Sequence, residues 1–509
     1  MIRKHATAVF LSSLVAAITA LDVWWRTLDL LPPHWDEGNH LGDSVVYLRL
    51  FNVHHPATVF DTVIGYPPLV NWVTDVFFAL LHNEAIWVAV LSNVVWTALL
   101  VFSTYGLGAR LWNRRVGLMS VAFVLASPMI VTTLKDYMFD TPLTATVALA
   151  LYFLVRADSF FSRRDSLWFG AACGIGLMVK WTFPLVIALP LLLGCVAGMA
   201  RARRERSLEP VVNLCGAAMA TFVIAGLWYL PKLHYLAAET NDKAFAGAPA
   251  GLPSPLSLDS VCWYFWKLLD QQLYLVPFLF FASGVAVCVR RREFASRNAY
   301  LILTVVGTYV VFTCLRDKDS RFTLPMLPAV AVIATSWLER LRARPRRVLA
   351  VGLVAYATAS FFAVNFAVPV LPKDVSIRLG PGPLLGTISS FAGYDGGRTV
   401  FFSRAQPPEI IGPPVRQNWH QEDPFRVLER FPQADRRLAY FGPRTLWFNQ
   451  FGLRYYALRF HTKRVSVPQS QFVLVRGPRL PPGVRLRTLD RWRLPGGERL
   501  VLYRRISTP

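Results

Sequence analysis

Charged side chains gather at four places in this otherwise apolar sequence, each next to a long hydrophobic run. A carboxylate at such a place can take the proton of an acceptor hydroxyl or amine as a bond to a sugar forms. Lysine and arginine side chains can neutralise a departing phosphate. The residues with this chemistry are Asp36 and Glu37; Lys135, Asp136 and Asp140; Lys180; and Arg316, Asp317, Lys318, Asp319 and Arg321.

The composition of this set differs from that of an ordinary glycoside hydrolase, which places two carboxylates across the bond it cleaves. A phosphate leaving group needs little help from an acid, so one carboxylate with several cations is a sufficient inventory. The residue types therefore predict acid–base chemistry beside a phosphate clamp.

Each of these places also has a purely structural interpretation. Asp36 and Glu37 could be loop charges or could cap a helix that begins near Gly38. Asp140 precedes a Thr-Pro pair and could cap the next hydrophobic helix. Lys180 could extend to the membrane interface, and the charges of residues 316–321 could neutralise one another. Spacing alone leaves both interpretations open.

Four histidines, His34, His40, His54 and His55, surround the first acidic pair. Their spacing fits no compact metal-ligand motif. The sequence therefore predicts no metal ligand. It does not firmly imply any cofactor, and the need for a divalent metal stays open.

The elements that must position these groups are membrane helices. Of the 509 residues, 54% are hydrophobic and 17% are charged, against about 25% charged residues in soluble domains. Apolar runs close to the roughly 20 residues that cross a bilayer recur along the chain. We expect eleven spans, at 7–25, 86–106, 116–134, 141–155, 166–180, 181–200, 211–230, 272–289, 298–315, 322–338 and 348–370. The predicted fold class is an all-α polytopic membrane protein with a C-terminal extracytoplasmic mixed α/β domain.

The net charge of +23 is largely a matter of membrane topology. Basic clusters occupy alternate connections, at 3–4, 110–115, 156–164, 201–206, 290–297 and 340–347. Short loops of this kind stay cytoplasmic, which predicts a cytoplasmic N-terminus and an external C-terminus in the inner membrane. No small-residue cleavage site follows the first run, so it is expected to be an anchor. A nucleic-acid partner is not expected.

Two external loops and a terminal domain complete the predicted organisation. Residues 1–370 form the membrane domain, in which loop 26–85 carries the acidic motif, and 231–271 is the second loop. We expect a helix over His40–Asn52 and an interfacial helix after Pro67-Pro68. Residues 371–509 hold 23 Lys+Arg and 9 Asp+Glu, and short β-type runs such as TVFF, FVLV and LVLY. This basic domain could bind anionic lipid or polysaccharide, or could be a solvated surface.

Five motifs together resemble a known family. WDEGNH, PPL, DYMFDTPL, GLMVKWTFPLVIALPLLL and RDKDSRFTLPMLPAVAVIA, in this order within about residues 1–345, resemble the GT-C-type membrane glycosyltransferases. These include the bacterial aminoarabinose transferases that act on lipid A and the protein O-mannosyltransferases. The resemblance implies a many-helix bundle that transfers a sugar from a polyprenyl-phosphate donor, among membrane lipids, to an extracytoplasmic acceptor.

The resemblance also implies roles for individual residues. Asp36 matches the acidic position usually assigned as the catalytic base, Glu37 its partner, and Asp140 the second acidic position. Lys180, Lys318 and Arg321 are similar to the cations near the lipid phosphate, and Arg316 is expected to assist them. Secondary candidates are Lys135, Asp136 and Tyr66.

The sequence departs from the family at two positions. Where the aminoarabinose transferases carry a Glu-Lys pair, this chain has Gly65-Tyr66, which removes a phosphate-contacting lysine and a metal ligand. Lys180 is followed by Trp181 instead of glycine. The sugar and the acceptor therefore cannot be inherited from the family. A transporter or flippase of a lipid-linked or anionic substrate, and a non-catalytic envelope scaffold, remain the alternative functions.

Overall fold

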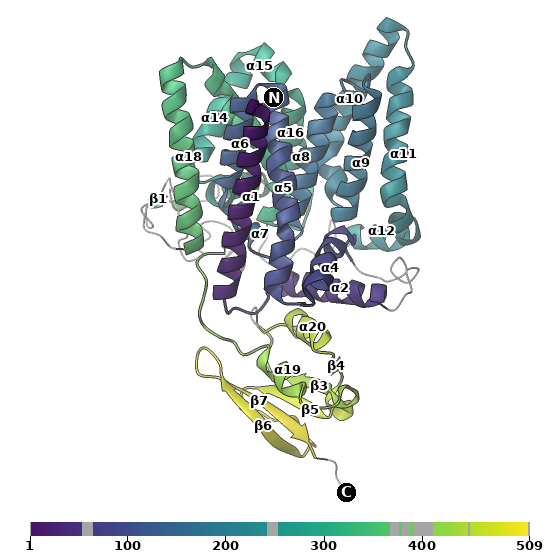
Figure 1. Cartoon of the computed structure of the whole chain (residues 1–509), viewed down its shortest axis with the longest axis vertical. Coiled ribbons are helices and arrows are strands. Elements are labelled where there is room, and N and C mark those ends of the chain that lie inside the picture. Colours follow the sequence, from purple (N-terminus) through teal and green to yellow (C-terminus); the bar gives the residue numbers. More distant parts are fainter. Residues whose placement is uncertain are drawn as a thin grey trace.

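The computed structural model describes residues 2–52, 65–241, 253–366, 376–378, 387–389, 411–445 and 448–506. Every predicted span overlaps a helix. The helices are α1 (Ile2–Leu28), α5 (Ile86–Leu111), α6 (Arg114–Leu125), α7 (Pro128–Leu134), α8 (Asp140–Arg156), α9 (Arg163–Val179), α10 (Phe183–Glu205), α11 (Glu209–Tyr229), α14 (Leu275–Arg290), α16 (Ala299–Cys314), α17 (Leu327–Ser336) and α18 (Ala343–Phe366). They form one bundle (Figure 1).

Helix length and apolarity identify fewer membrane-crossing helices than the eleven predicted spans. In the described part of the chain, six helices are long and apolar enough to cross a membrane, or seven if α6 and α7 form one bent span. The 73° bend arises where Ser127 caps α7 and Pro128 occupies its first turn. α14 and α16 are apolar but shorter. The count of eleven spans stays a prediction.

Short helices lie at the end of the bundle next to the C-terminal domain. α2 (Trp35–Asn52) and α12 (Leu233–Asn241) run across the bundle axis, near α4 (Leu69–Leu81) (Figure 1). α2 begins before the expected His40 because its first turn includes Asp36 and Glu37, and carboxylates stabilise a helix N-terminus. α12 and α13 (Leu258–Lys267) occupy the expected loop 231–271, while most of its Gly/Pro-rich run lies outside the described residues.

Close helix contacts fix α9, after which Lys180 follows directly. A Cβ on Gly170 would lie 2.1 Å from the carbonyl oxygen of Ala217 in α11. A Cβ on Gly176 would lie 2.3 Å from the ring of Phe183 in α10. Because only glycine permits such approaches, the end of α9 has a closely defined position.

A small α/β unit follows the bundle. Its sheet has the strand order β4-β3-β5-β7-β6. β3 (Arg437–Phe441) is parallel to β4 (Lys463–Arg464) and β5 (Phe472–Arg476), whereas β7 (Arg499–Arg505) is antiparallel to β5 and β6 (Leu486–Arg493). The unit also contains α19 (Asp423–Leu428) and α20 (Gln450–Arg459). A separate two-stranded sheet pairs β1 (Ser376–Arg378) with β2 (Thr387–Ser389). FVLV and LVLY are confirmed as strands; TVFF lies outside the described residues.

The C-terminal unit packs on α2 through α20. A Cβ on Gly38 would lie 2.7 Å from the backbone nitrogen of Gly452, so the two helices touch backbone to backbone. Beside this contact, Arg454 Nη1 donates to Asp43 Oδ1 at 2.7 Å. The N-terminus and the basic helix α15 (Arg292–Arg297) lie at the opposite end of the bundle (Figure 1).

Candidate active site

Four predicted site residues come together at the end of the bundle that faces the C-terminal unit. Asp36 lies in the first turn of α2, and Asp140 is the first residue of α8. Lys180 follows the last residue of α9. Arg321 lies in the 3-10 turn η4 (Ser320–Met326), which leads into α17. Residues far apart in the sequence thus converge because four helix ends meet.

These residues form a chain of ion pairs, which we call the charged cluster: Asp36, Asp140, Lys180, Asp319 and Arg321. Lys180 Nζ donates to Asp140 Oδ1 at 2.8 Å. Arg321 lies 3.7 Å from Asp140 Oδ2 through Nη1 and donates to Asp36 Oδ2 at 2.9 Å through Nη2. Arg321 also pairs with Asp319. Two cations therefore face three carboxylates.

The Asp140–Lys180 pair is buried. Only 2% of Asp140 and 8% of Lys180 is exposed. The side chain of Asp140 does not cap α8, whose N-cap is Phe139, and Lys180 does not extend into solvent. In the part of the chain that the structure describes, Asp140 Oδ2 has no hydrogen-bond partner, and Arg321 Nη1 lies 3.7 Å from it. An oxygen in this state is expensive to bury, so the cluster has an unused acceptor.

Asp36 is the exposed member of the cluster, with 52% of its side chain accessible. Burial of its surroundings alone would raise the pKa of the Asp36 carboxyl, but the Arg321 guanidinium outweighs burial and holds that pKa well below its usual range. Asp36 is therefore an ionised carboxylate that incoming molecules can reach.

Asp319 fixes the position of Arg321. Its carboxylate accepts the backbone N–H of Arg321 at 2.8 Å and also the Nε–H at 3.0 Å. Burial raises the pKa of Asp319, but the Arg321 guanidinium overrides burial and lowers it. The sequence placed Asp319 among the charged residues with possible chemistry but predicted no role for it, although its spacing two residues before Arg321 in RDKDSR is the signal that could have identified one.

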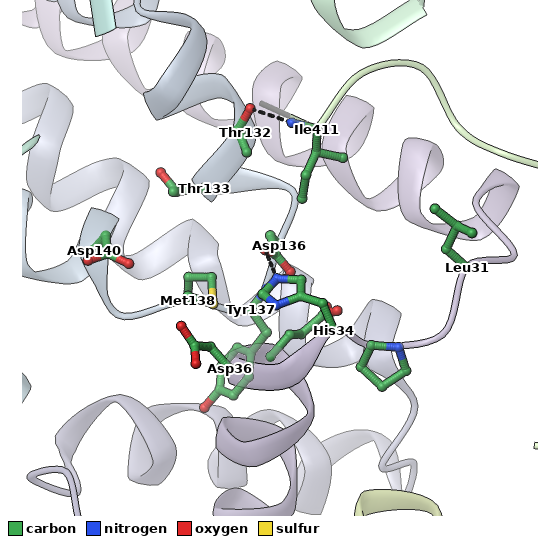
Figure 2. Close-up of polar contacts among 12 residues, drawn as sticks. Leu31, His34, Asp36, Thr132, Thr133, Asp136, Tyr137, Met138, Asp140 and Ile411 are labelled. Atoms are coloured by element: carbon green, nitrogen blue, oxygen red, sulfur yellow. Dashed lines mark hydrogen bonds and ion pairs between the residues drawn. The ribbon is translucent and has the colours of Figure 1, made fainter. Parts of the chain in front are cut away.

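A second group of polar residues lies behind Asp36. His34 Nε2 is 2.7 Å from Asp136 Oδ2 (Figure 2), and Arg26 Nη2 is 3.8 Å from Glu37 Oε1. Burial lowers the pKa of His34, but Asp136 raises it to about 9. Burial and the Asp136 charge raise the pKa of Glu37. At neutral pH the His34 ring is therefore protonated and positively charged next to the Asp136 carboxylate.

The same group is the place where the described residues could hold a metal ion. His34, Glu37 and Asp136 each offer one donor atom, and these atoms lie within 4.8 Å of one another. The donor set of one imidazole and two carboxylates suits a divalent cation. The direct contact between His34 and Asp136, and the guanidinium of Arg26 beside Glu37, already satisfy these charges without an ion.

Two predicted cations, Lys318 and Lys135, form hydrogen bonds with residues outside the charged cluster. Lys318 is 1% exposed and donates to the carbonyls of Phe312, Thr313 and Leu315 at 3.3, 3.0 and 2.9 Å. It closes the C-terminal end of α16 through these carbonyls, and its predicted role near the lipid phosphate stays a prediction. Lys135 is fully buried and donates to Asn365 Oδ1 at 2.7 Å and to the Gly412 carbonyl at 3.0 Å.

The two remaining candidates lie at the edge of the site. Arg316 is exposed in the turn before η4. Lys180 Nζ lies 6.0 Å from the centre of the Tyr66 ring, which packs edge-on against His40. Sequence reasoning missed Arg26 and its partner Asp29, because both stand where the first hydrophobic run ends and charged residues usually meet water.

An apolar pocket of about 460 Å³ opens between α9, α10 and α11. Its lining includes Leu177 and Phe183, each three residues from Lys180, together with Cys173 and Tyr229. The pocket therefore begins close to the buried end of the charged cluster.

Parts of the chain match known proteins. The family model described as dolichyl-phosphate-mannose-protein mannosyltransferase matches residues 66–229. An undecaprenyl phosphate-alpha-4-amino-4-deoxy-L-arabinose arabinosyl transferase of Pseudomonas aeruginosa strain LESB58 is 26% identical over 312 residues, covering 56% of this chain and 53% of that protein. The protein of the same name from Erwinia tasmaniensis is 23% identical over 260 residues, covering 50% and 45%. The chain thus spans about half the length of the curated relatives it matches.

The fold extends the similarity over almost the whole chain. The crystal structure of ArnT from Cupriavidus metallidurans bound to undecaprenyl phosphate superposes with a TM-score of 0.62 at 15% identity, covering 96% of this chain and 97% of that one. The same protein in the apo state gives a TM-score of 0.61 at 15% identity, covering 98% of each chain. The resemblance to the GT-C-type membrane glycosyltransferases is therefore confirmed in sequence and in fold.

Proposed function

We propose that this chain transfers a sugar from a polyprenyl-phosphate donor to an acceptor at the membrane face where the C-terminal unit lies. The observation that carries the proposal is the charged cluster, which combines a reachable ionised carboxylate with two cations at the end of a membrane bundle. The relatives named for a transferase that uses undecaprenyl phosphate-linked aminoarabinose support this donor class. A transporter would instead place its charges near the membrane midplane.

The proposed reaction needs one base and a stabilised leaving group. The acceptor hydroxyl or amine attacks the anomeric carbon, the bond from that carbon to the phosphate oxygen breaks, and the phosphate leaves with the bonding electrons. Asp36 takes the acceptor proton. Lys180 and Arg321 stabilise the charge that grows on the phosphate.

The charge balance of the cluster suggests how donor binding activates Asp36. Both cations are already paired, so a phosphate can bind Arg321 only by displacing a carboxylate. Asp36 is the carboxylate that leaves most readily, because 52% of its side chain is exposed against 22% for Asp319 and 3% for Asp140. Once Arg321 binds the phosphate, the basicity of Asp36 rises. The base is therefore strengthened only when the donor is present.

The apolar pocket beside Lys180 suits the polyprenyl chain of the donor. Apolar area buried there contributes about 25 cal/mol per Å², independently of the sugar. A donor whose chain lies along α9 and α11 would bring its phosphate toward Lys180, since Leu177 and Phe183, each three residues from Lys180, line the pocket.

The remaining site residues have lesser roles in this proposal. Glu37 and Asp136 hold the first turn of α2 through their contacts with Arg26 and His34. Arg316, which is exposed, can add charge to the donor phosphate. Lys318 and Lys135 are structural.

Membrane orientation follows from the arginine-rich connections. They share the end of the bundle that carries the N-terminus and α15 (Figure 1), and such loops stay cytoplasmic. We therefore propose a multi-pass protein of the inner membrane whose residues 371–509, and whose charged cluster, face the extracytoplasmic side.

The test is sugar transfer by Asp36→Asn in membranes supplied with labelled polyprenyl-phosphate-linked sugars. We expect transfer to fall by a factor of about 10²–10⁴, the usual contribution of a general base. Glu205→Gln, which changes an exposed carboxylate in α10, should keep full transfer at equal expression. Undiminished transfer by Asp36→Asn would disprove the role of Asp36. Mass spectrometry of envelope lipids and glycans, with and without the protein, would identify the sugar and the acceptor.

A further inference from the structure

A polar pocket of about 470 Å³ lies where the bundle meets the C-terminal unit. It is lined by the last turn of α1 and the residues after it, by the start of α5 including Trp87, by residues between 418 and 426 and by α20. Its volume falls within the range of about 300–1,000 Å³ that is typical of small-molecule sites. We call it the interdomain pocket.

Gln421 is the residue that points to a ligand. It lines the interdomain pocket and is only 2% exposed, yet neither its amide nitrogen nor its amide oxygen has a hydrogen-bond partner among the described residues. A buried polar group without partners costs about 1–3 kcal/mol. An amide that can donate and accept at once therefore remains available to a bound molecule.

The charges of the interdomain pocket indicate an uncharged ligand. Its three arginines are all paired within the protein: Arg26 with Asp29 at 2.7 Å, and Arg426 and Arg459 with Glu422 at 2.6 and 3.2 Å. Asp423, the third carboxylate of the lining, pairs with His420 at 2.6 Å. The three arginines and three carboxylates of the described lining balance one another, so the pocket carries no net charge that would favour an ion, whereas amides, carboxylates and guanidinium groups offer hydrogen bonds to hydroxyls.

Trp87 adds the apolar surface that a ring-shaped polar ligand needs. Its indole is partly buried at the start of α5 and lines the pocket. A ligand that presents many hydroxyls at its edges and C–H groups on its face is a saccharide, and an aromatic side chain and a planar amide in one lining match the two parts.

We propose that the interdomain pocket binds a saccharide of the acceptor. The donor phosphate is expected at the charged cluster, and Leu31, which lines the pocket, lies on the far side of His34 from Asp140 (Figure 2). Arg26 joins the two places, because it lines the pocket and lies 3.8 Å from Glu37, the neighbour of Asp36. The inference that the saccharide belongs to the acceptor rests on the proposed function. The inference that the pocket binds a saccharide does not.

The test is saturation-transfer NMR of the full chain in lipid nanodiscs with methyl glycosides of glucose, mannose, galactose, N-acetylglucosamine and arabinose. We expect at least one glycoside to bind, and Gln421→Leu to raise its dissociation constant about tenfold or more, since two hydrogen bonds are lost. Gln469→Leu, which changes an exposed glutamine of the same domain, should bind as the unaltered chain does. Trp87→Leu is the second variant if Gln421→Leu does not fold.

Asp36→Asn separates this inference from the proposed function. It should bind the glycoside normally although transfer is lost. Binding that depends on Gln421 in a chain without transferase activity would contradict the proposed function and support the pocket. If the unaltered chain binds no glycoside of the panel, or if Gln421→Leu and Trp87→Leu both bind as well as the unaltered chain, the saccharide site is wrong.

Discussion

The buried pair of Lys180 and Asp140 should stabilise the fold by a measurable coupling energy. Replacing Lys180 by methionine leaves Asp140, which is 2% exposed, with Arg321 at 3.7 Å as its nearest cation. Breaking a buried pair by removing one partner costs about 3–5 kcal/mol. Because Arg321 remains, we expect a loss of about 2–4 kcal/mol for Lys180→Met, and a smaller further loss when Asp140→Asn is added.

The assay is a double-mutant cycle on the free energy of unfolding, measured by SDS titration of the purified protein in mixed micelles. The coupling energy of Lys180 and Asp140 should reach about 2 kcal/mol. The pair of Arg201 and Asp158 is a matched control, since its contact is equally short at 2.9 Å but its side chains are 37% and 66% exposed. Its coupling energy should stay below about 1 kcal/mol.

Additive effects of the two substitutions at Lys180 and Asp140, within about 0.5 kcal/mol, would refute the assignment of this contact as a structural and electrostatic unit. A coupling energy equal to that of the exposed control pair would have the same meaning, because burial would then contribute nothing.

Two further predictions concern how α2 is held. Asp136 raises the pKa of His34 from 6.5 to about 9. The protonated ring therefore stabilises the fold fully below pH 6.5, and its contribution of at most about 3 kcal/mol is lost as the pH rises through 9. The melting temperature should decline over this range, and His34→Gln should make that decline smaller. Gly38→Ala puts a Cβ 2.7 Å from Gly452 and should lower the melting temperature and speed proteolytic release of the C-terminal unit. Gly352→Ala is the control, because its Cβ would meet nothing within 4 Å, and it should be neutral or stabilise the fold by up to about 1 kcal/mol. Equal melting temperatures of the two alanine variants would contradict the prediction for Gly38. An unchanged pH profile of His34→Gln would contradict the prediction for His34.

Hydrophobic runs and charge clusters were sufficient to predict the helices and the residues at their ends. Each run of apolar residues became a helix, because a segment in lipid must satisfy its backbone internally. The 40-residue separation of Asp140 and Lys180 could not be converted into a contact from sequence, since that requires knowing which helix ends meet. Lys318 and Arg321 are equivalent cations of RDKDSR by sequence. In the structure, Lys318 contacts the carbonyls of α16, whereas Arg321 contacts the carboxylates of the charged cluster.

The contact between α2 and α20 had no sequence signal at all. Gly38 and Gly452 are ordinary glycines until their helices meet, and the Arg454–Asp43 pair joins residues of opposite ends of the chain. Local periodicity predicts which face of a helix is apolar, but says nothing about which other element covers it.

In the proposed function, the position of Asp36 gives a reason for the packing of the C-terminal unit on α2. α2 is held from one side by the His34–Asp136 contact to the loop before α8, and from the other by Arg454 and the Gly452 backbone of α20. Among the described residues, Asp36 is held by an ion pair with Arg321, a partner that donor binding is proposed to take away. At that moment the backbone of α2 alone keeps the carboxylate within reach of the acceptor, and a misplacement of about 1 Å can cost a hundredfold in rate. In the proposed reaction, the C-terminal unit would contribute to catalysis by holding Asp36 in place after its ion pair with Arg321 is broken.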